Sequence, residues 1–211
     1  MSLDLLRLTH WLSPAFPTGA YAYSQGLEWA LGPGGIVDAA GVEAWLEVML
    51  RRGAAWQDAV LLGLALEPGA DLGRLAERTE AMAPSTGRLR EMRDQGRAFG
   101  VTLAAMGQGE ADGLPLPVAV GRAARGLDLP KGMVIAQYLH GWVLNLATIA
   151  VRAVPLGQSE GQRIVQALQP VVLEVAERAA LASEDDLGAS AFGADMAGML
   201  QESLDVRIYR T

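Results

Sequence analysis

The sequence predicts an all-α protein, a single-domain bundle of about eight or more helices that spans residues 1–211. Apolar residues recur at steps of three and four along most of the chain, which is the period of amphipathic helices. Alternation of apolar and polar residues, which marks β-strands, does not recur. No stretch is long enough to link two domains, and 211 residues with 51% hydrophobic residues can bury one large core.

The first strongly periodic helix is expected within residues 38–53. Asp38 is a suitable N-cap, apolar residues recur from Val42 to Met49, and Gly53 is a usual residue for ending a helix. Residues 54–69 repeat this pattern and end at Gly69. Residues 72–82 predict a shorter amphipathic helix.

A long helix is expected over residues 85–107. One face carries apolar and small residues at alternating three- and four-residue steps: Leu89, Met92, Gly96, Phe99, Leu103 and Met106. The other face is assigned the charged residues Arg88, Arg90, Glu91, Arg93, Asp94 and Arg97. The sequence therefore predicts an amphipathic helix here.

The second half of the chain continues in helices. A loop over 107–117 precedes a helix that Pro117 opens, and an apolar helix covers 133–151. Ser159 and Gln162 are expected to form a capping box for a helix that runs to about residue 183, which Pro170 should kink or split. A surface loop, a short helix and a tail complete the chain to residue 211.

The composition excludes several classes of protein. A net charge of −7 argues against a basic face that binds nucleic acid. Cysteine is absent, which excludes disulfides and thiolate metal sites. This agrees with a reducing compartment, and we expect a cytoplasmic protein. Residues 1–12 carry Asp4 and Arg7 among their apolar residues and do not resemble a signal peptide.

The apolar segment 133–151 is near the length of a membrane span. It contains Gln137, His140, Asn145 and Thr148, whose side chains would be costly against lipid. A buried core helix is therefore favoured, and a membrane span remains the alternative.

No catalytic, cofactor or metal site is predicted. The chain lacks a phosphate-binding GxxxxGK[ST] loop, a GxSxG nucleophile motif and an HExxH zinc motif. Gly32, Gly34 and Gly35 favour a turn between helices over a dinucleotide site. The acidic run 184–186 favours a solvated loop over a weak cation site. One alternative is a helical small-molecule-binding enzyme whose site, in the bundle core, uses Gln137, His140 and Asn145.

Two segments have the chemistry of protein interfaces. Residues 13–31 combine prolines, glycines and aromatic residues, and the end of the chain places Arg207 and Arg210 on either side of Tyr209. Arginine and tyrosine are enriched at binding hot spots. By elimination, the sequence favours a helical protein that acts by binding other proteins.

Five motifs occur in order along the chain: "LSPAFPTGAYAYSQGLEWAL", "WLEVMLRRGAAWQDAVLL", "STGRLREMRDQGRAF", "VRAVPLGQSEGQR" and "MLQESLDVRIYRT". In this combination the chain resembles the UreF family of urease accessory proteins over nearly its whole length. It departs from the family pattern at Gly19-Ala20, where the family has paired glycines. Gln201 stands in place of a histidine, and Tyr209 in place of a phenylalanine.

The resemblance implies an all-helical homodimer with no catalysis and no cofactor of its own. Members of the family bind a second accessory protein, UreD, also called UreH. Together they recruit the GTPase UreG and urease apoprotein, and the assembly helps to deliver nickel and carbon dioxide to the urease active site.

The resemblance also implies a set of partner-binding residues: Tyr21, Tyr23, Gln25, Glu28, Gln201, Glu202, Arg207, Tyr209 and Arg210. For residues 13–31 the alternative is that the tyrosines and Trp29 pack in the core while the glycines only allow the turn. The tail 203–211 is allowed to be flexible and is expected to become ordered mainly on the UreD-type partner, the alternative being a frayed end.

Overall fold

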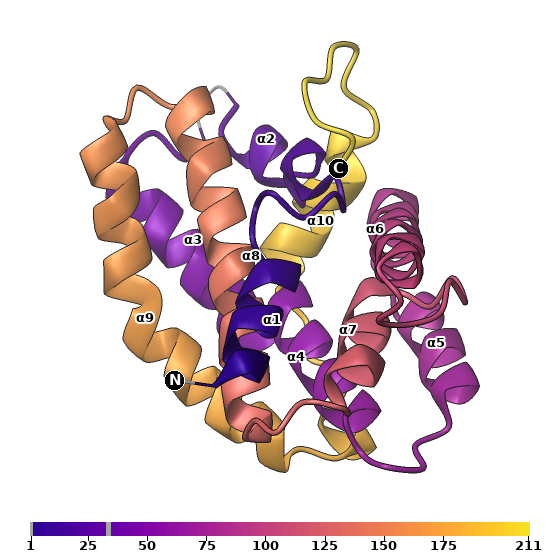
Figure 1. The fold of residues 1–211 in the computed structure, drawn as a ribbon. Coiled ribbons are helices and arrows are strands. Elements are labelled where there is room, and N and C mark those ends of the chain that lie inside the picture. The colour runs from indigo at the N-terminus through magenta and orange to yellow at the C-terminus, as the bar shows by residue number, and fades with distance from the viewer. Residues whose placement is uncertain (1, 33–34) are drawn as a thin grey trace.

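A computed structural model describes residues 2–32 and 35–211. These residues form ten α-helices and two short 3₁₀ helices and contain no β-strand, which confirms the all-α class (Figure 1). The elements are α1 (Leu3–Trp11), η1 (Ala20–Ala22), α2 (Leu27–Ala30), α3 (Ala39–Arg52), α4 (Ala54–Ala65), α5 (Leu72–Ala81), α6 (Thr86–Ala105), α7 (Leu116–Ala124), α8 (Lys131–Ala153), α9 (Gln158–Leu181), η2 (Glu184–Asp186) and α10 (Phe192–Gln201). Gly34, part of the turn expected at 32–35, lies outside the described residues.

Helix α8 runs through the middle of the bundle. It packs against α9 along most of its length and contacts α4 and α3, while α6 and α5 lie on the far side of α7 (Figure 1). Ile135, Leu139 and Leu146 of α8 are fully buried in the main hydrophobic core. The core therefore surrounds the long apolar helix that the sequence predicts over residues 133–151.

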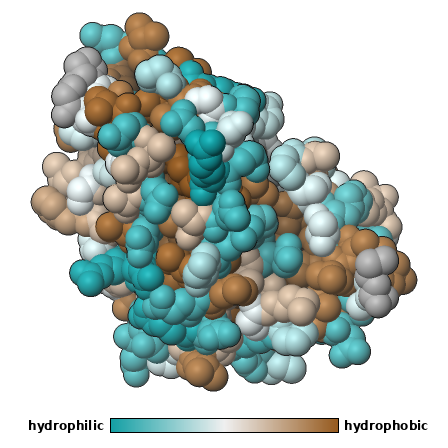
Figure 2. Space-filling model, turned by 90° about the vertical axis from the view of Figure 1, so that its left-hand side faces the viewer, coloured by the Kyte–Doolittle hydropathy of each residue, from teal (hydrophilic) through white to brown (hydrophobic). Residues whose placement is uncertain are grey.

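By length and composition alone, α8 is the one helix among the described residues that could cross a membrane. Its burial among α3, α4 and α9 favours the core-helix interpretation. Figure 2 shows a face of the molecule on the side of α9, where hydrophilic side chains run down the middle and hydrophobic ones are interspersed. This face does not carry the continuous hydrophobic belt that lipid contact requires.

Side-chain caps confirm the predicted starts of α3 and α6. The Asp38 carboxylate accepts a hydrogen bond of 2.8 Å from the backbone N–H of Gly41. The Ser85 hydroxyl accepts one of 3.1 Å from the N–H of Arg88 at the start of α6. These side chains satisfy backbone donors that have no partner within the first turn.

The expected capping box of α9 is wrong, and of the two outcomes expected at Pro170 the split does not occur. The helix begins at Gln158, so Ser159 lies inside it, and the carboxylate of Glu160 accepts a hydrogen bond of 2.9 Å from the N–H of Gly157. Pro170 does not split the helix. Both Pro170 and Gln166 are exposed, so water can bond the Gln166 carbonyl that proline leaves without a donor.

Candidate functional site

The C-terminal end of the chain packs on residues 22–28 beside α6, a contact called the junction below. After α10, residues 203–208 form a loop that projects above the bundle, and the chain then returns to the N-terminal segment (Figure 1). The N–H of Arg210 donates a hydrogen bond of 2.8 Å to the carbonyl of Ala22. The N–H groups of Ser24 and Gln25 both donate to the main-chain oxygen of Thr211, the latter at 3.0 Å. The tail thus packs on the chain's own residues 22–28.

Glu28 is the main side-chain anchor of this tail. Its carboxylate accepts hydrogen bonds from the backbone N–H groups of Ile208 at 2.7 Å and Tyr209 at 3.1 Å. It also accepts one of 3.0 Å from the amide of Gln201, which is fully buried. The Gln201 oxygen in turn accepts a hydrogen bond of 3.0 Å from the Ser24 hydroxyl. The Glu28 carboxylate therefore binds both the end of α10 and the residues at the end of the loop, Ile208 and Tyr209.

A left-handed turn at Gln25 and Gly26 makes this junction compact. Their φ angles are 53° and 82°, in the region that glycine adopts readily and other residues rarely. A Cβ atom on Gly26 would lie 2.7 Å from the backbone nitrogen of Gly198, so glycine also allows α10 to approach. The turn aims the Gln25 amide inward, where it donates to Glu91 at 2.8 Å and accepts from the Trp142 indole at 2.9 Å.

Beneath the junction lies a buried network of charges. Arg88 of α6 donates to Asp58 of α4 at 2.6 Å and to Glu91 at 3.0 Å, and the Tyr138 hydroxyl donates to Asp58 at 2.7 Å. Burial alone would lower the pKa of Arg88, but the carboxylates of Asp58 and Glu91 raise it above its ordinary value. The Thr211 hydroxyl, 3.3 Å from Glu91, joins the tail to this network.

The assignment of Arg88 and Glu91 to the charged outer face of the long helix is therefore wrong. Only 8% of Arg88 and 2% of Glu91 is exposed. The spacing of Arg88, Glu91 and Gln95 relative to Phe99 places all of them on the buried side. This spacing is visible in the sequence, and it could have identified a buried polar pair on an otherwise apolar face.

The structure divides the nine predicted partner-binding residues into two groups. Tyr23, Gln201 and Tyr209 are buried, and Gln25 and Glu28 are half-buried and hydrogen-bonded within the chain. The exposed group consists of Tyr21, which is 69% exposed, Glu202, Arg207 and Arg210. Val206 and Ile208, which the sequence analysis did not select, are also exposed on the projecting loop.

Tyr23 lies between Arg210 of the tail and Asp94 of α6. Its hydroxyl donates a hydrogen bond of 3.2 Å to Asp94. Burial raises the pKa of Tyr23, and a hydrogen bond with Arg210 opposes the increase. The core-packing alternative for residues 13–31 thus describes Tyr23 but not Tyr21 or Trp29, which is 42% exposed.

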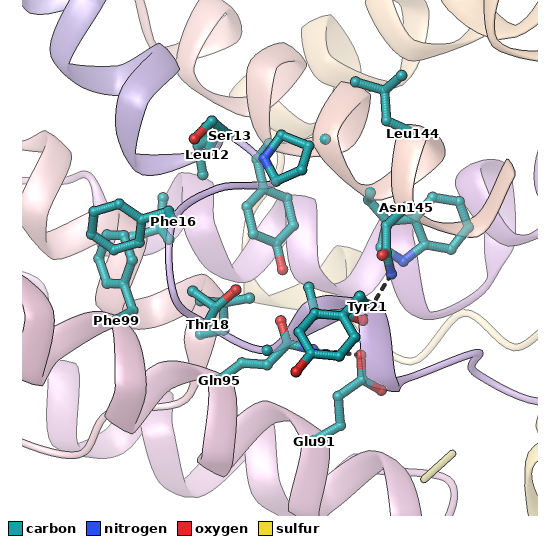
Figure 3. Close-up of a pocket in the computed structure, with 18 of the residues that line it drawn as sticks. Leu12, Ser13, Phe16, Thr18, Tyr21, Glu91, Gln95, Phe99, Leu144 and Asn145 are labelled. Carbon is teal, nitrogen blue, oxygen red and sulfur yellow. Dashed lines mark hydrogen bonds between the residues drawn. The ribbon is translucent and has the colours of Figure 1, made fainter. Parts of the chain in front are cut away.

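A cavity of about 560 Å³ lies next to the junction, between segment 11–21, α6 and α8 (Figure 3). Its walls include the aromatic side chains of Trp11, Phe16, Phe99 and Trp142. Figure 3 shows Glu91 and Gln95 rising from α6 toward Tyr21 and Asn145.

Of the residues suggested for a core enzyme site, Asn145 lines the cavity and donates a hydrogen bond of 3.0 Å to the carbonyl of Ala20. Gln137 and His140 are not among its lining residues. The structure therefore does not bring these three residues together at the cavity.

The acidic run 184–186 forms η2, in which Glu184 binds Arg74 at 2.8 Å and Asp186 accepts the N–H of Ser183 at 2.8 Å. Over the described ranges, no group of three or more histidine, aspartate or glutamate residues is placed to hold a metal ion. Glu184 thus takes part in an ion pair, and Asp186 caps the start of η2.

Comparison with known proteins identifies the family. A model of the UreF family matches residues 36–169, more than half of the chain. The urease accessory protein UreF of Jannaschia sp. (strain CCS1) is 52% identical over 207 residues, which cover 98% of this chain and 94% of the relative. The urease accessory protein UreF of Cereibacter sphaeroides (strain ATCC 17025 / ATH 2.4.3) is 48% identical over 211 residues and the full length of both chains. The chain therefore belongs to the UreF family of urease accessory proteins, non-enzymatic components of urease maturation.

Proposed function

We propose that this chain binds a UreD/UreH-type accessory protein and, together with it, recruits the GTPase UreG and urease apoprotein for nickel incorporation. We further propose that it works in the cytoplasm as a homodimer. The full-length similarity to UreF proteins supports this role. The single observation that carries the docking proposal is the projecting loop 203–208, anchored at both of its ends by Glu28.

The anchored loop suits a protein partner for a physical reason. Glu28 holds the backbone while the side chains of Val206, Arg207 and Ile208 remain exposed. A loop that is ordered before binding loses less conformational entropy when the partner arrives. Arg207 supplies a guanidinium for a charge-assisted contact, and its two neighbours supply apolar area.

Helix α10 extends this surface toward the bundle. Phe192, Met196 and Met199 recur at steps of four and three on one side of the helix, and all three are exposed. Since α10 leads directly into the anchored loop, we assign this stripe to the same UreD-type partner. Methionine adapts to irregular apolar surfaces, which suits such a contact.

Capture of the UreD-type partner by variants of the exposed group tests the proposal. We expect Arg207→Ala combined with Arg210→Ala to weaken capture by at least tenfold, because two candidate hot-spot residues are removed together. The melting temperature should stay close to that of the parent. Arg163→Ala, at an exposed position on α9, is the matched control and should leave capture unchanged. Unchanged capture by the double variant would contradict the docking role.

A second measurement tests self-association. Sedimentation equilibrium at tens of micromolar should give the mass of two chains of 22.3 kDa. A single-chain mass at that concentration would contradict a stable homodimer.

A further inference from the structure

The cavity beside the junction has the dimensions of a small-molecule site. Its volume of about 560 Å³ lies within the range of about 300–1,000 Å³ that is usual for ligand pockets. Segment 13–18 covers it on one side, and it reaches the surface at Tyr21, Thr148 and Arg152, all three of which are exposed. A small molecule can therefore enter without unfolding the bundle.

The walls of the cavity are suited to a flat apolar group. Phe16 lies between His10 and Phe99, with ring centroids 5.5 Å from each, and Trp11 meets Phe99 edge to face at 6.4 Å. The Trp11 and Trp142 indoles are held by hydrogen bonds to Gln108 and Gln25, so their rings are fixed in place. Such rings favour offset or edge-on contact with another aromatic ring.

The charges at the inner end of the cavity favour a cation. Asp58, Arg88 and Glu91 all line it and are buried, and two carboxylates against one guanidinium leave an excess of one negative charge. The neutral donors around Glu91, which include Gln25 and Gln95, share this charge but do not cancel it. Arg152, the cation at the mouth, is exposed to water, which weakens its effect on the interior.

We propose that this cavity binds a small aromatic amine, with its ring between Phe16, Phe99 and Trp142 and its ammonium group toward Glu91. Binding a cation here would compensate a buried excess of negative charge, which is costly when it is left unpaired. This site is separate from the proposed docking loop, and the proposal does not depend on the identity of any protein partner.

The proposal is tested with three indoles of similar shape and different charge, namely tryptamine, 3-indolepropionate and indole. Isothermal titration of the isolated full-length chain should show tryptamine binding at least tenfold more tightly than the anion, with the neutral ring in between. Equal affinities, a preference for the anion, or no binding at millimolar concentrations would overturn the proposal.

A matched pair of variants locates the binding. Leu144 lies on the cavity wall (Figure 3), so Leu144→Trp should fill part of the space and weaken tryptamine binding at least tenfold. Leu181→Trp makes the same change at a residue that is 90% exposed and outside the cavity lining, and it should have no effect. Glu91→Gln should remove the preference for the amine over the anion if the variant folds. If Glu91→Gln does not fold, the Leu144→Trp result decides, and unchanged tryptamine binding by that variant contradicts the location.

Discussion

The carboxylate of Glu28 lies 3.1 Å from the backbone nitrogen of Tyr209 and accepts its hydrogen bond across 181 positions of sequence. The same carboxylate accepts the N–H of Ile208 at 2.7 Å. This contact fixes the position of the loop that carries Arg207. Stability and partner binding should therefore respond to different residues of one short segment.

Removal of the Glu28 carboxylate should release the tail. Glu28→Ala leaves the N–H groups of Ile208 and Tyr209 and the amide of Gln201 without their acceptor. We expect a loss of about 1.5–3 kcal/mol in the free energy of unfolding, which is usual for hydrogen bonds to a charged group. Trypsin should also cleave after Arg207 faster than in the parent.

The control for this variant is Glu177→Ala, at an exposed position of α9. It should change neither urea unfolding nor cleavage. If Glu28→Ala behaves like Glu177→Ala in both measurements, Glu28 does not anchor the tail.

Truncation of the chain after Glu202 should lower stability without destroying the helical fold. The sequence alone predicts little loss, because few core positions lie in the tail. In the structure, however, Tyr209 is 7% exposed and belongs to the main core, and Thr211 is 5% exposed. Loss of a buried aromatic side chain costs about 3–5 kcal/mol. Circular dichroism should therefore show retained helix with a clearly lower melting temperature, and an unchanged melting temperature would show that the tail does not pack as described.

Arg88→Met should be among the most destabilising single substitutions in α6. It leaves the buried carboxylates of Asp58 and Glu91 without their cation. Breaking a buried ion pair by removal of one partner costs about 3–5 kcal/mol. The triple variant with Asp58→Asn and Glu91→Gln should recover part of that loss in urea unfolding, since no buried charge then remains unpaired. A triple variant less stable than Arg88→Met would contradict this account.

Alkaline stability should depend on Tyr138. Burial, aided by the negative charge of Asp58, raises the pKa of the Tyr138 hydroxyl well above 10.0. In the unfolded chain this hydroxyl loses its proton near pH 10.0, which is a lower pH than in the folded protein. The contribution of Tyr138 to stability is therefore complete below about pH 10 and falls as the pH rises toward the folded-state pKa.

Tyr138→Phe removes this titration. The free energy of unfolding of the variant should decline less steeply than that of the parent between about pH 9 and pH 11. In a pH titration followed by absorbance at 295 nm, the variant should also lack the phase at high pH that the ionisation of Tyr138 gives in the parent. If the free energies of unfolding of parent and variant decline in parallel, and the high-pH phase of the absorbance titration is unchanged, Tyr138 is not shielded in the folded protein.

Helical periodicity predicted the bundle because each long helix has one face against a shared core. The segment 133–151 became the central helix for this reason. The pattern did not identify α1, since a short helix is defined by its contacts more than by its own period. The helix expected before Gly32 is the four-residue α2. The capping box of α9 was predicted two positions too late in the sequence. Several polar side chains near Gly157 can serve as caps, and the local pattern does not distinguish them.

The junction could not be predicted from local patterns. Glu28 and Tyr209 are joined only when α10 packs on α2, and nothing near either residue in the sequence indicates the other. Family resemblance selected both residues without showing that they touch. It also could not separate Tyr23, whose side chain is buried, from Tyr21, whose side chain is exposed.

The most direct test of the central claim is hydrogen–deuterium exchange of the full-length chain, alone and with a UreD-type partner. The account predicts slower exchange over residues 203–208 and in α10 on addition of the partner, with no change at the exposed middle of α9. Exchange in 203–208 that stays the same while another surface becomes protected would show that the anchored loop is not the docking element.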